Sequence, residues 1–483
     1  MSLKHKTISG LIWSFIDSIA GQGITFIIGI ILARILSPKE FGLIGMLTIF
    51  IAISQSLIDS GFRQALIRKQ NCTQADYSTV FYFNIIVGIL FYILLFGCAE
   101  AIGNFYHEPI LKELIRVLGL ALIINSFTII QSTLLTKRID FKLQAKISVI
   151  ASFISGTISI YMAYTGWGVW SLVALSLVKY AINSLLLWFW NKWKPIWVFS
   201  QQSFKELFSF GSKLLVSGLI DTIYRNVYYL VIGKYFAAVE LGYYTLADQF
   251  QSIPSSNLQG IIGRVSYPVL STIQDDIQRL RESYKKIIKS TMLITFVLML
   301  GMAAIARPMI LTLIGEKWEP SVIYLQMLCF VGMFYPLHAL NLNMLQVQGR
   351  SDLFLRLEII KKVLAVPIII IGILWGIKAM ILGMMLLTLI AYYLNSYWSG
   401  RLIGYSFLEQ LKDITPSFLV AIIMSSVVFA EGLLIPLPPL PLLTIQLITG
   451  VFLTLGICET VHFKDYLYIK SIVTDKFLKR YPL

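Results

Sequence analysis

The residues best able to do chemistry in this sequence are basic and amide side chains that stand inside long apolar stretches. Lys179, Arg225 and Arg264 are the basic ones, and Gln55 and Gln259 lie in the polar stripes of their own segments. An ionisable group at membrane depth costs a few kcal/mol, about 2.5 to 3.5 on insertion scales, so its presence indicates a function. The planar guanidinium of arginine matches phosphate oxygens well. We therefore expect these five residues to line a cationic pocket for an anionic head group.

Carboxylates stand in the same kind of surroundings and predict a different task. Asp17, Asp59 and Asp221 are candidates for coupling to H⁺ or Na⁺, because a carboxylate in a low-dielectric site can hold a proton near neutral pH. His338, beside Pro336, is either a proton relay or a hydrogen-bonded residue between helices. The four cysteines lack metal-ligand spacing and no phosphate-binding P-loop motif occurs, so we expect no metal, no cofactor and no enzymatic activity.

Simpler structural roles remain open for several of these residues. Asp221 and Arg225 are four apart, so they could neutralise each other along one helix. Asp59 and Arg63 lie near the end of a predicted span, where charged groups reach water easily. Lys179 could extend its ammonium toward the membrane surface. The sequence does not decide between these roles and a shared binding site.

The elements that must position these residues are membrane helices. The chain has 483 residues, of which 57% are hydrophobic and 13% charged, and its mean hydropathy is +0.76. Soluble proteins carry about 25% charged residues, so a soluble enzyme is excluded. At about 20 residues per span, the length allows roughly 13 to 15 helices. The net charge of +15 fits basic cytoplasmic loops and does not require a nucleic-acid partner.

Hydropathy and loop charge predict an all-α membrane protein of about 14 transmembrane helices. The loops on one predicted side carry 29 lysine and arginine residues and those on the other carry 8, which predicts that both termini are cytoplasmic. The span at 246–270 is polar and is predicted only because the charge pattern requires it to cross. The predicted spans are 8–34, 41–61, 78–100, 112–134, 147–165, 169–190, 212–236, 246–270, 287–306, 321–347, 359–376, 379–398, 415–433 and 441–460.

A weak internal repeat indicates two lobes. Ile16-Asp17-Ser18 matches Ile220-Asp221-Thr222, and Glu40-Phe41-Gly42 matches Glu240-Leu241-Gly242. Transporters built from repeats hold substrate between their halves. We expect an N-terminal six-helix lobe at 1–195, an amphipathic cytoplasmic linker at 196–211, a C-terminal six-helix lobe at 212–400, two extra transmembrane helices at 401–462 and a cytoplasmic tail at 463–483.

The sequence also resembles a known family. Residues 32–70, LARILSPKEFGLIGMLTIFIAISQSLIDSGFRQALIRKQ, are similar to the start of the polysaccharide transport family of flippases, within the multidrug/oligosaccharidyl-lipid/polysaccharide exporter superfamily. The segments AIGNFYHEPIL, LLTKRIDFKLQAK, SFKELFSFGSKLL and VELGYYTLADQF extend the resemblance over most of the chain.

This resemblance implies a bacterial inner-membrane flippase of the type that exports O-antigen or colanic-acid units. It implies that undecaprenyl-diphosphate-linked oligosaccharides cross the membrane by alternating access, with H⁺ or Na⁺, membrane lipids, and a polysaccharide polymerase and its chain-length machinery as partners. Relatives that flip the peptidoglycan precursor carry arginines in their first helices, whereas the first span here has Asp17. The alternatives are a drug or cation antiporter of the same superfamily and a membrane-embedded glycan polymerase or ligase.

Overall fold

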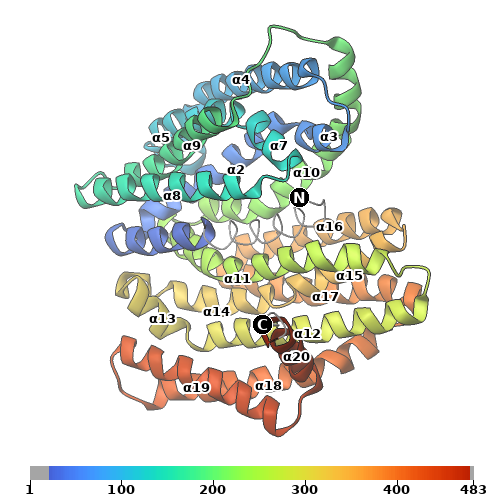
Figure 1. Cartoon of the computed structure of the whole chain (residues 1–483). Coiled ribbons are helices and arrows are strands. Elements are labelled where there is room, and N and C mark those ends of the chain that lie inside the picture. The colour runs from blue at the N-terminus through green and yellow to red at the C-terminus, as the bar shows by residue number, and fades with distance from the viewer. Residues whose placement is uncertain (1–20, 479–483) are drawn as a thin grey trace. The chain divides into compact units, whose positions relative to one another are not determined.

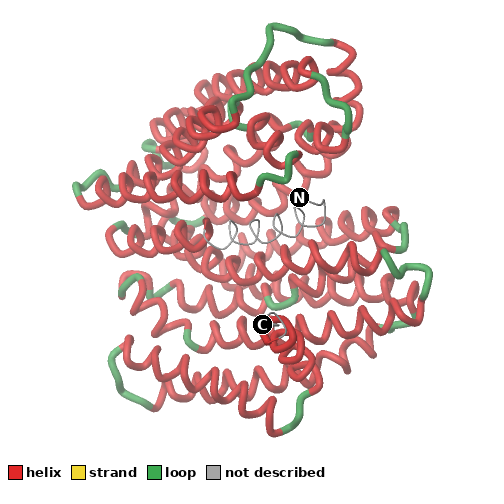
Figure 2. The backbone as a smooth tube through the Cα atoms, viewed as in Figure 1, coloured by secondary structure: helices red, strands yellow, loops and turns green. Residues whose placement is uncertain are grey.

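The structure, a computed structural model, describes residues 21–478, apart from the side chains of residues 261, 263–265, 268, 472, 473 and 475–478. Every regular element in this part of the chain is a helix, as the tube in Figure 2 shows, which confirms the predicted all-α fold. The chain forms two compact units, Met1–Thr245 and Leu246–Leu483, each described by itself below.

Unit 1, coloured blue to green in Figure 1, begins in the described part with the short helix Gly21–Ile35. Several helices start at a capping side chain. Asp76 N–H bonds the Thr73 hydroxyl before α4, and Leu143 N–H bonds the Asp140 carboxylate before α8. The other helices of the unit are α2 (Pro38–Asp59), α3 (Phe62–Arg68), α4 (Gln74–Tyr106), α5 (Leu111–Leu118), α6 (Leu120–Ser126), α7 (Ile129–Lys137), α8 (Phe141–Tyr164), α9 (Val169–Asn191) and α10 (Gln201–Tyr235).

Helix α11 (Ala238–Ser271) begins in unit 1 and continues into unit 2. Within unit 2, α12 packs mainly against α18, and α16 mainly against α17. The remaining helices of unit 2 are α12 (Ile277–Ala304), α13 (Ala306–Leu313), the 3₁₀ turn η1 (Glu316–Trp318), α14 (Ser321–Gly332), α15 (Tyr335–Val347), α16 (Ser351–Trp375), α17 (Ile377–Ile403), α18 (Phe407–Leu434), α19 (Pro439–Thr460) and α20 (Lys464–Leu478).

The structure confirms that the chain contains many helices able to span a membrane, but it does not establish the predicted number of 14. Among residues 21–478, nine helices are long and apolar enough to cross a membrane, and the bent pair Leu111–Ser126 and Ile129–Lys137 makes ten. The spans predicted at 212–236, 246–270 and 359–376 exist as the long helices α10, α11 and α16. These three are too rich in polar residues to meet the same criterion.

The segment predicted as a linker at 196–211 is largely the first part of α10. This helix runs unbroken for 35 residues, so the linker and the predicted seventh span are one element. Part of its apolar side packs inside unit 1: Leu207 is buried, and Phe204 packs against Phe62 of α3 and Phe83 of α4. Trp197 and Phe208 of the same segment remain exposed. Helix α10 thus joins unit 1, and the unit boundary falls between residues 245 and 246.

A pair of glycines brings α10 against the end of α2. Gly61 has φ +70°, a left-handed conformation that suits glycine. A Cβ atom on Gly61 would lie 2.3 Å from the carbonyl oxygen of Gly211, so only hydrogen fits there. This contact lets the turn between α2 and α3 pass directly over the backbone of α10.

The matched segments of the internal repeat contact each other reciprocally. A Cβ atom on Gly42 would lie 1.7 Å from the Ala238 carbonyl oxygen, and one on Gly242 would lie 1.9 Å from the Pro38 carbonyl oxygen. The first turns of α2 and α11 therefore cross backbone to backbone, with equivalent positions meeting each other. We call this contact the glycine crossing.

Candidate functional site

Unit 1 holds a group of polar side chains at mid-helix depth, which we call the polar wall: Thr25, Gln55, Lys179 and Tyr180. The Lys179 ammonium donates to the Thr25 hydroxyl oxygen at 3.2 Å, and Thr25 in turn donates to the Gly21 carbonyl at 2.8 Å. The Gln55 amide nitrogen donates to the Tyr180 hydroxyl oxygen at 3.0 Å. Three helices therefore meet through hydrogen bonds: Gly21–Ile35, α2 and α9 (Figure 1).

Lys179 stands far from either end of its helix. It is ten residues after Val169, the first residue of α9, which corresponds to about 15 Å along the axis. Its ammonium is directed to a neighbouring helix, where it donates to Thr25. The adjacent Tyr180 was not expected to take part. Its position next to Lys179 in an apolar helix was the only signal for it, and tyrosine is common at membrane interfaces.

Arg225 lies on α10 with its side chain exposed. Asp221 is also exposed and lies one helical turn before Arg225, so the two opposite charges share one side of the helix. In this structure the guanidinium of Arg225 remains accessible from outside unit 1.

The register between α10 and α2 places Arg225 at the level of the polar wall. The two helices run antiparallel, since a Cβ on Gly218 would lie 3.9 Å from the Ser56 hydroxyl and one on Gly233 would lie 2.9 Å from Cγ of Met46. Arg225 falls between these two contacts, and so about one helical turn from Gln55 along the axis. Asp221, between Gly218 and Arg225, falls still closer to the level of Gln55. Unit 1 thus presents one lysine, one arginine, one carboxylate, one amide and one phenol within a narrow range of depth.

The predicted carboxylates are placed differently. One carboxylate oxygen of Asp59 accepts the Arg63 backbone N–H at 3.4 Å, across the turn between α2 and α3. This contact holds the half-buried Asp59 against the first turn of α3. Asp221 lies exposed on α10, one turn before Arg225. Asp17 lies outside the described residues.

Two predicted residues belong to unit 2. Gln259 is half-buried on α11. Arg264 lies on the same helix, but its side chain is outside the described part of the structure. Of the eight predicted site residues, the structure therefore brings four to one level of unit 1: Gln55, Lys179, Asp221 and Arg225. Asp59 makes a local backbone contact, Gln259 lies in unit 2, and Asp17 and the side chain of Arg264 lie outside the described part.

A charged group within α16 was missed by the sequence reasoning. Lys361 pairs with the carboxylate of Glu358, and the Lys362 ammonium lies 3.9 Å from the same carboxylate. The exposed fraction of the side chain is 14% for Lys361, 17% for Lys362 and 23% for Glu358. The charge count assigned both lysines to a cytoplasmic loop, whereas α16 begins ten residues earlier, at Ser351. The spacing Glu-x-x-Lys-Lys was the available signal for a helical pair.

Polar groups elsewhere in unit 2 join α15 to α17. The Ser399 hydroxyl donates to the Asn341 amide oxygen at 2.6 Å, and both residues are fully buried. The amide nitrogen of Asn395 lies 3.4 Å from Nδ1 of His338. These contacts match the interhelical role considered for His338.

The groups in both units are suited to reversible binding. Ammonium, guanidinium and amide groups donate hydrogen bonds to hydroxyl and phosphate oxygens, and a phenol can donate or accept. Within residues 21–478, no group of three or more histidine, cysteine or carboxylate residues is arranged to hold a metal ion. The arrangement fits a surface that recognises an anionic, hydroxyl-rich molecule.

Comparison with known proteins identifies the family. The family model described as polysaccharide biosynthesis protein matches residues 31–323, more than half of the chain. The chain belongs to this family. The predicted resemblance to polysaccharide flippases is confirmed by this match and by the relatives of the chain.

Curated relatives match over most of their length. The lipopolysaccharide biosynthesis protein WzxC of Escherichia coli K12 is 27% identical over 446 residues, which cover 90% of this chain and 89% of WzxC. The teichuronic acid biosynthesis protein TuaB of Bacillus subtilis is 27% identical, covering 73% of each chain. The succinoglycan biosynthesis transport protein ExoT of Rhizobium meliloti is 26% identical, covering 66% of this chain and 64% of ExoT.

Solved structures show the same fold at low identity. The inward closed form of the lipid II flippase MurJ matches with a TM-score of 0.76 and 15% identity, covering 95% of this chain and all of MurJ. An inward-facing multidrug transporter of the MATE family matches with a TM-score of 0.64 and 15% identity, covering 79% of this chain and 94% of that one. This protein is therefore a multi-pass membrane protein with a transporter fold.

Proposed function

We propose that this protein flips lipid-linked oligosaccharide repeat units across the bacterial inner membrane by alternating access. The observation that carries the proposal is the polar wall of a family member, with Lys179 and Gln55 at mid-helix depth and Arg225 at the same level. The diphosphate and sugars of the substrate would contact these donors. The prenyl tail would stay among the lipid chains, because exposing its apolar surface to water is unfavourable.

We further propose that the basic residues favour an anionic cargo over a cationic drug. A transporter for cations needs a surplus of acidic groups on the surface that meets its substrate. The polar wall and the part of α10 at its level carry two basic groups, Lys179 and Arg225, and one acidic group, Asp221. Lys361 and Lys362 of α16 join the candidate set for unit 2, with Arg264 and Gln259 of α11. A preference for anionic cargo agrees with the predicted lipid-diphosphate substrate. The drug antiporter remains the alternative.

The remaining expectations from the sequence complete the proposal. Both termini face the cytoplasm, H⁺ or Na⁺ drives the transport, and the exported units pass to a polysaccharide polymerase and its chain-length machinery. Asp17, Asp221 and Asp59 stay the candidates for ion coupling, although the contact of Asp59 with the backbone of Arg63 gives it a structural task as well. The protein carries out no covalent chemistry in this proposal.

A flipping assay in proteoliposomes tests the proposed function. We expect Lys179→Ala, Arg225→Ala and Arg264→Ala each to slow transport of a prenyl-diphosphate oligosaccharide by about tenfold, the size of one lost hydrogen bond to a charged group. Lys179→Arg should retain most of the rate, because it keeps the charge. Lys205→Ala, an exposed lysine in the first part of α10, is the matched control. Unchanged transport in all three variants would remove the cationic surface from the mechanism.

A second measurement separates the proposed substrate from the alternative. Cells that overproduce the wild-type protein should show no gain in resistance to cationic dyes. Resistance to such dyes, together with unchanged oligosaccharide flipping in the three variants, would favour the antiporter.

A further inference from the structure

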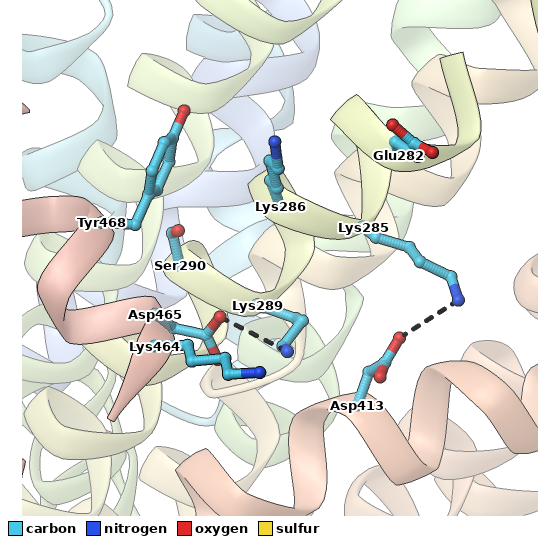
Figure 3. A pocket seen from close by; sticks show the side chains of 9 residues that line it. All are labelled: Glu282, Lys285, Lys286, Lys289, Ser290, Asp413, Lys464, Asp465 and Tyr468. Carbon is cyan, nitrogen blue, oxygen red and sulfur yellow. Dashed lines mark ion pairs between the residues drawn. The ribbon is translucent and has the colours of Figure 1, made fainter. Parts of the chain in front are cut away.

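Unit 2 contains a basic pocket away from the residues discussed so far. It has a volume of about 350 Å³ and lies where α12, α18 and α20 meet (Figure 3). Its size is at the lower end of that of small-ligand sites. All three helix segments belong to the side predicted to be cytoplasmic. The residues used below are Lys285, Lys286, Lys289, Lys464, Asp413 and Asp465.

The charges around this pocket are incompletely balanced. The Lys289 ammonium lies 3.4 Å from the Asp465 carboxylate, and the Lys285 ammonium lies 3.7 Å from the Asp413 carboxylate (Figure 3). Lys286 and Lys464 form no ion pair within the described part of the chain. Glu282 also lines the pocket, so its four lysines face three carboxylates. The lining therefore carries one excess positive charge, which favours an anion.

Two acidic groups near Lys285, those of Asp413 and Glu409, are engaged with closer donors than this lysine. The Tyr405 hydroxyl donates to the Asp413 carboxylate at 2.8 Å, which is closer than Lys285. Glu409, 3.9 Å from Lys285, receives two bonds from the Arg281 guanidinium at 2.8 and 3.0 Å. These contacts leave Lys285 only loosely paired, so its ammonium can also turn to a bound anion.

A buried hydroxyl adds a neutral donor to the same pocket. Ser290 lines the pocket, and its hydroxyl oxygen is shielded from water and has no hydrogen-bond partner in the described structure. Buried polar groups are usually hydrogen-bonded, so such a group often marks the place of a ligand. Several ammonium groups and one hydroxyl match an anion with many oxygen acceptors, and lysine binds phosphate as a point charge.

We propose that this pocket binds a phosphate or diphosphate group. The helices around it indicate that a lipid carries the group. Leu467 and Tyr468 of α20 and Leu408 and Leu411 of α18 are exposed beside the charged residues. A helix with basic and apolar faces lies at a membrane surface, where lysines attract anionic head groups. The pocket would thus hold a head group at the membrane surface, apart from the polar wall.

The proposal is tested by binding, without any transport measurement. The full-length protein is placed in phosphatidylcholine nanodiscs, and inorganic pyrophosphate binding is measured by titration calorimetry. We expect the pair Lys286→Gln and Lys464→Gln to weaken binding at least about tenfold per lysine. Lys412→Gln, an exposed lysine of α18 outside the pocket, should bind as the wild type does. Asp465→Asn should strengthen binding, because it removes a negative charge.

A second arm distinguishes a lipid from a free anion. The protein is reconstituted with equal amounts of phosphatidylglycerol and phosphatidylcholine, and the lipids it retains are counted by native mass spectrometry. Retention of phosphatidylglycerol that the paired substitution abolishes supports a lipid head group, and a loss seen only with pyrophosphate supports a free phosphate compound. If the double variant does not fold, the single variant Lys286→Gln, which changes an exposed side chain, is used in the same two binding measurements.

Two results would overturn the inference. One is pyrophosphate binding that is equal in the wild type and the pocket variants, with no preference for phosphatidylglycerol. The other is an equal loss of binding in Lys412→Gln, which would indicate only a general attraction to surface charge. Because neither arm needs a flipping rate, the inference and the proposed function can fail separately.

Discussion

The glycine crossing between α2 and α11 allows a quantitative test of the tertiary contact that the internal repeat produces. Replacing Gly42 with alanine places a methyl group 1.7 Å from the Ala238 carbonyl oxygen, and ordinary contact begins at 3.4 Å. The backbones must therefore separate by about 1.7 Å at this point. Gly242→Ala requires about 1.5 Å at the same crossing, measured from the Pro38 carbonyl oxygen. Neither obstacle is a flexible side chain that could turn away.

Each single substitution should destabilise the protein by about 1 to 3 kcal/mol, the usual range for overpacking. The two costs should not add, since one separation of the helices makes room for both methyl groups. We expect the double variant to cost about as much as Gly42→Ala alone. The coupling energy should then be roughly equal to the cost of the second substitution, again about 1 to 3 kcal/mol.

The assay is thermal unfolding of the purified protein in one detergent, followed by tryptophan fluorescence at one heating rate. Gly97→Ala on α4 is the control, because no atom lies within 4 Å of its added methyl group. This control should be neutral or slightly more stable, by at most about 1 kcal/mol, from the higher helix propensity of alanine. Fully additive losses in the double variant, or a Gly42→Ala midpoint equal to that of Gly97→Ala, would refute the backbone contact described here.

Three further outcomes follow from single contacts and use the same unfolding assay. Lys137→Met removes the ammonium that binds carbonyls at the end of α3, so it should cost about 1.5 to 3 kcal/mol, while Lys205→Met should be neutral; equal midpoints would contradict this. Ser399→Ala leaves the buried Asn341 amide oxygen without that donor and should cost about 0.6 to 1.7 kcal/mol; a gain in stability would count against the bond. Burial raises the pKa of Asp465 above its ordinary 3.8, although a neighbouring ammonium opposes this, so its ionised form destabilises the fold near neutral pH. Asp465→Asn should therefore raise the midpoint at neutral pH, and this gain should disappear as the pH falls toward 3.8; a pH-independent difference would exclude the linkage.

Much of the architecture could be predicted from composition because a membrane helix satisfies its backbone hydrogen bonds locally. An apolar stretch of sufficient length therefore predicts an element without knowledge of its neighbours. The same reasoning identified Lys179 and Gln55, since a polar group in an apolar helix needs a partner wherever that partner lies. The family resemblance likewise followed from the segment at 32–70.

Helix boundaries near charged residues could not be predicted in this way. Lys361 and Lys362 were counted as loop residues, yet α16 begins at Ser351 and holds both lysines beside Glu358. The segment at 196–211 has the amphipathic pattern of a surface helix, but part of its apolar face, with Phe204 and Leu207, packs in a core shared with α3 and α4. Hydropathy reports that a face is apolar and does not report whether lipid or protein covers it.

The sequence by itself determined that this is an all-helical membrane protein of the polysaccharide biosynthesis family, and which polar residues stand inside its helices. Only the tertiary structure decided their partners: Thr25 for Lys179 and Tyr180 for Gln55. The physical reason is that a helix forms from contacts within a few residues, whereas a side-chain hydrogen bond between helices depends on packing. That packing joins residues more than a hundred positions apart, as Gln55 and Tyr180 show.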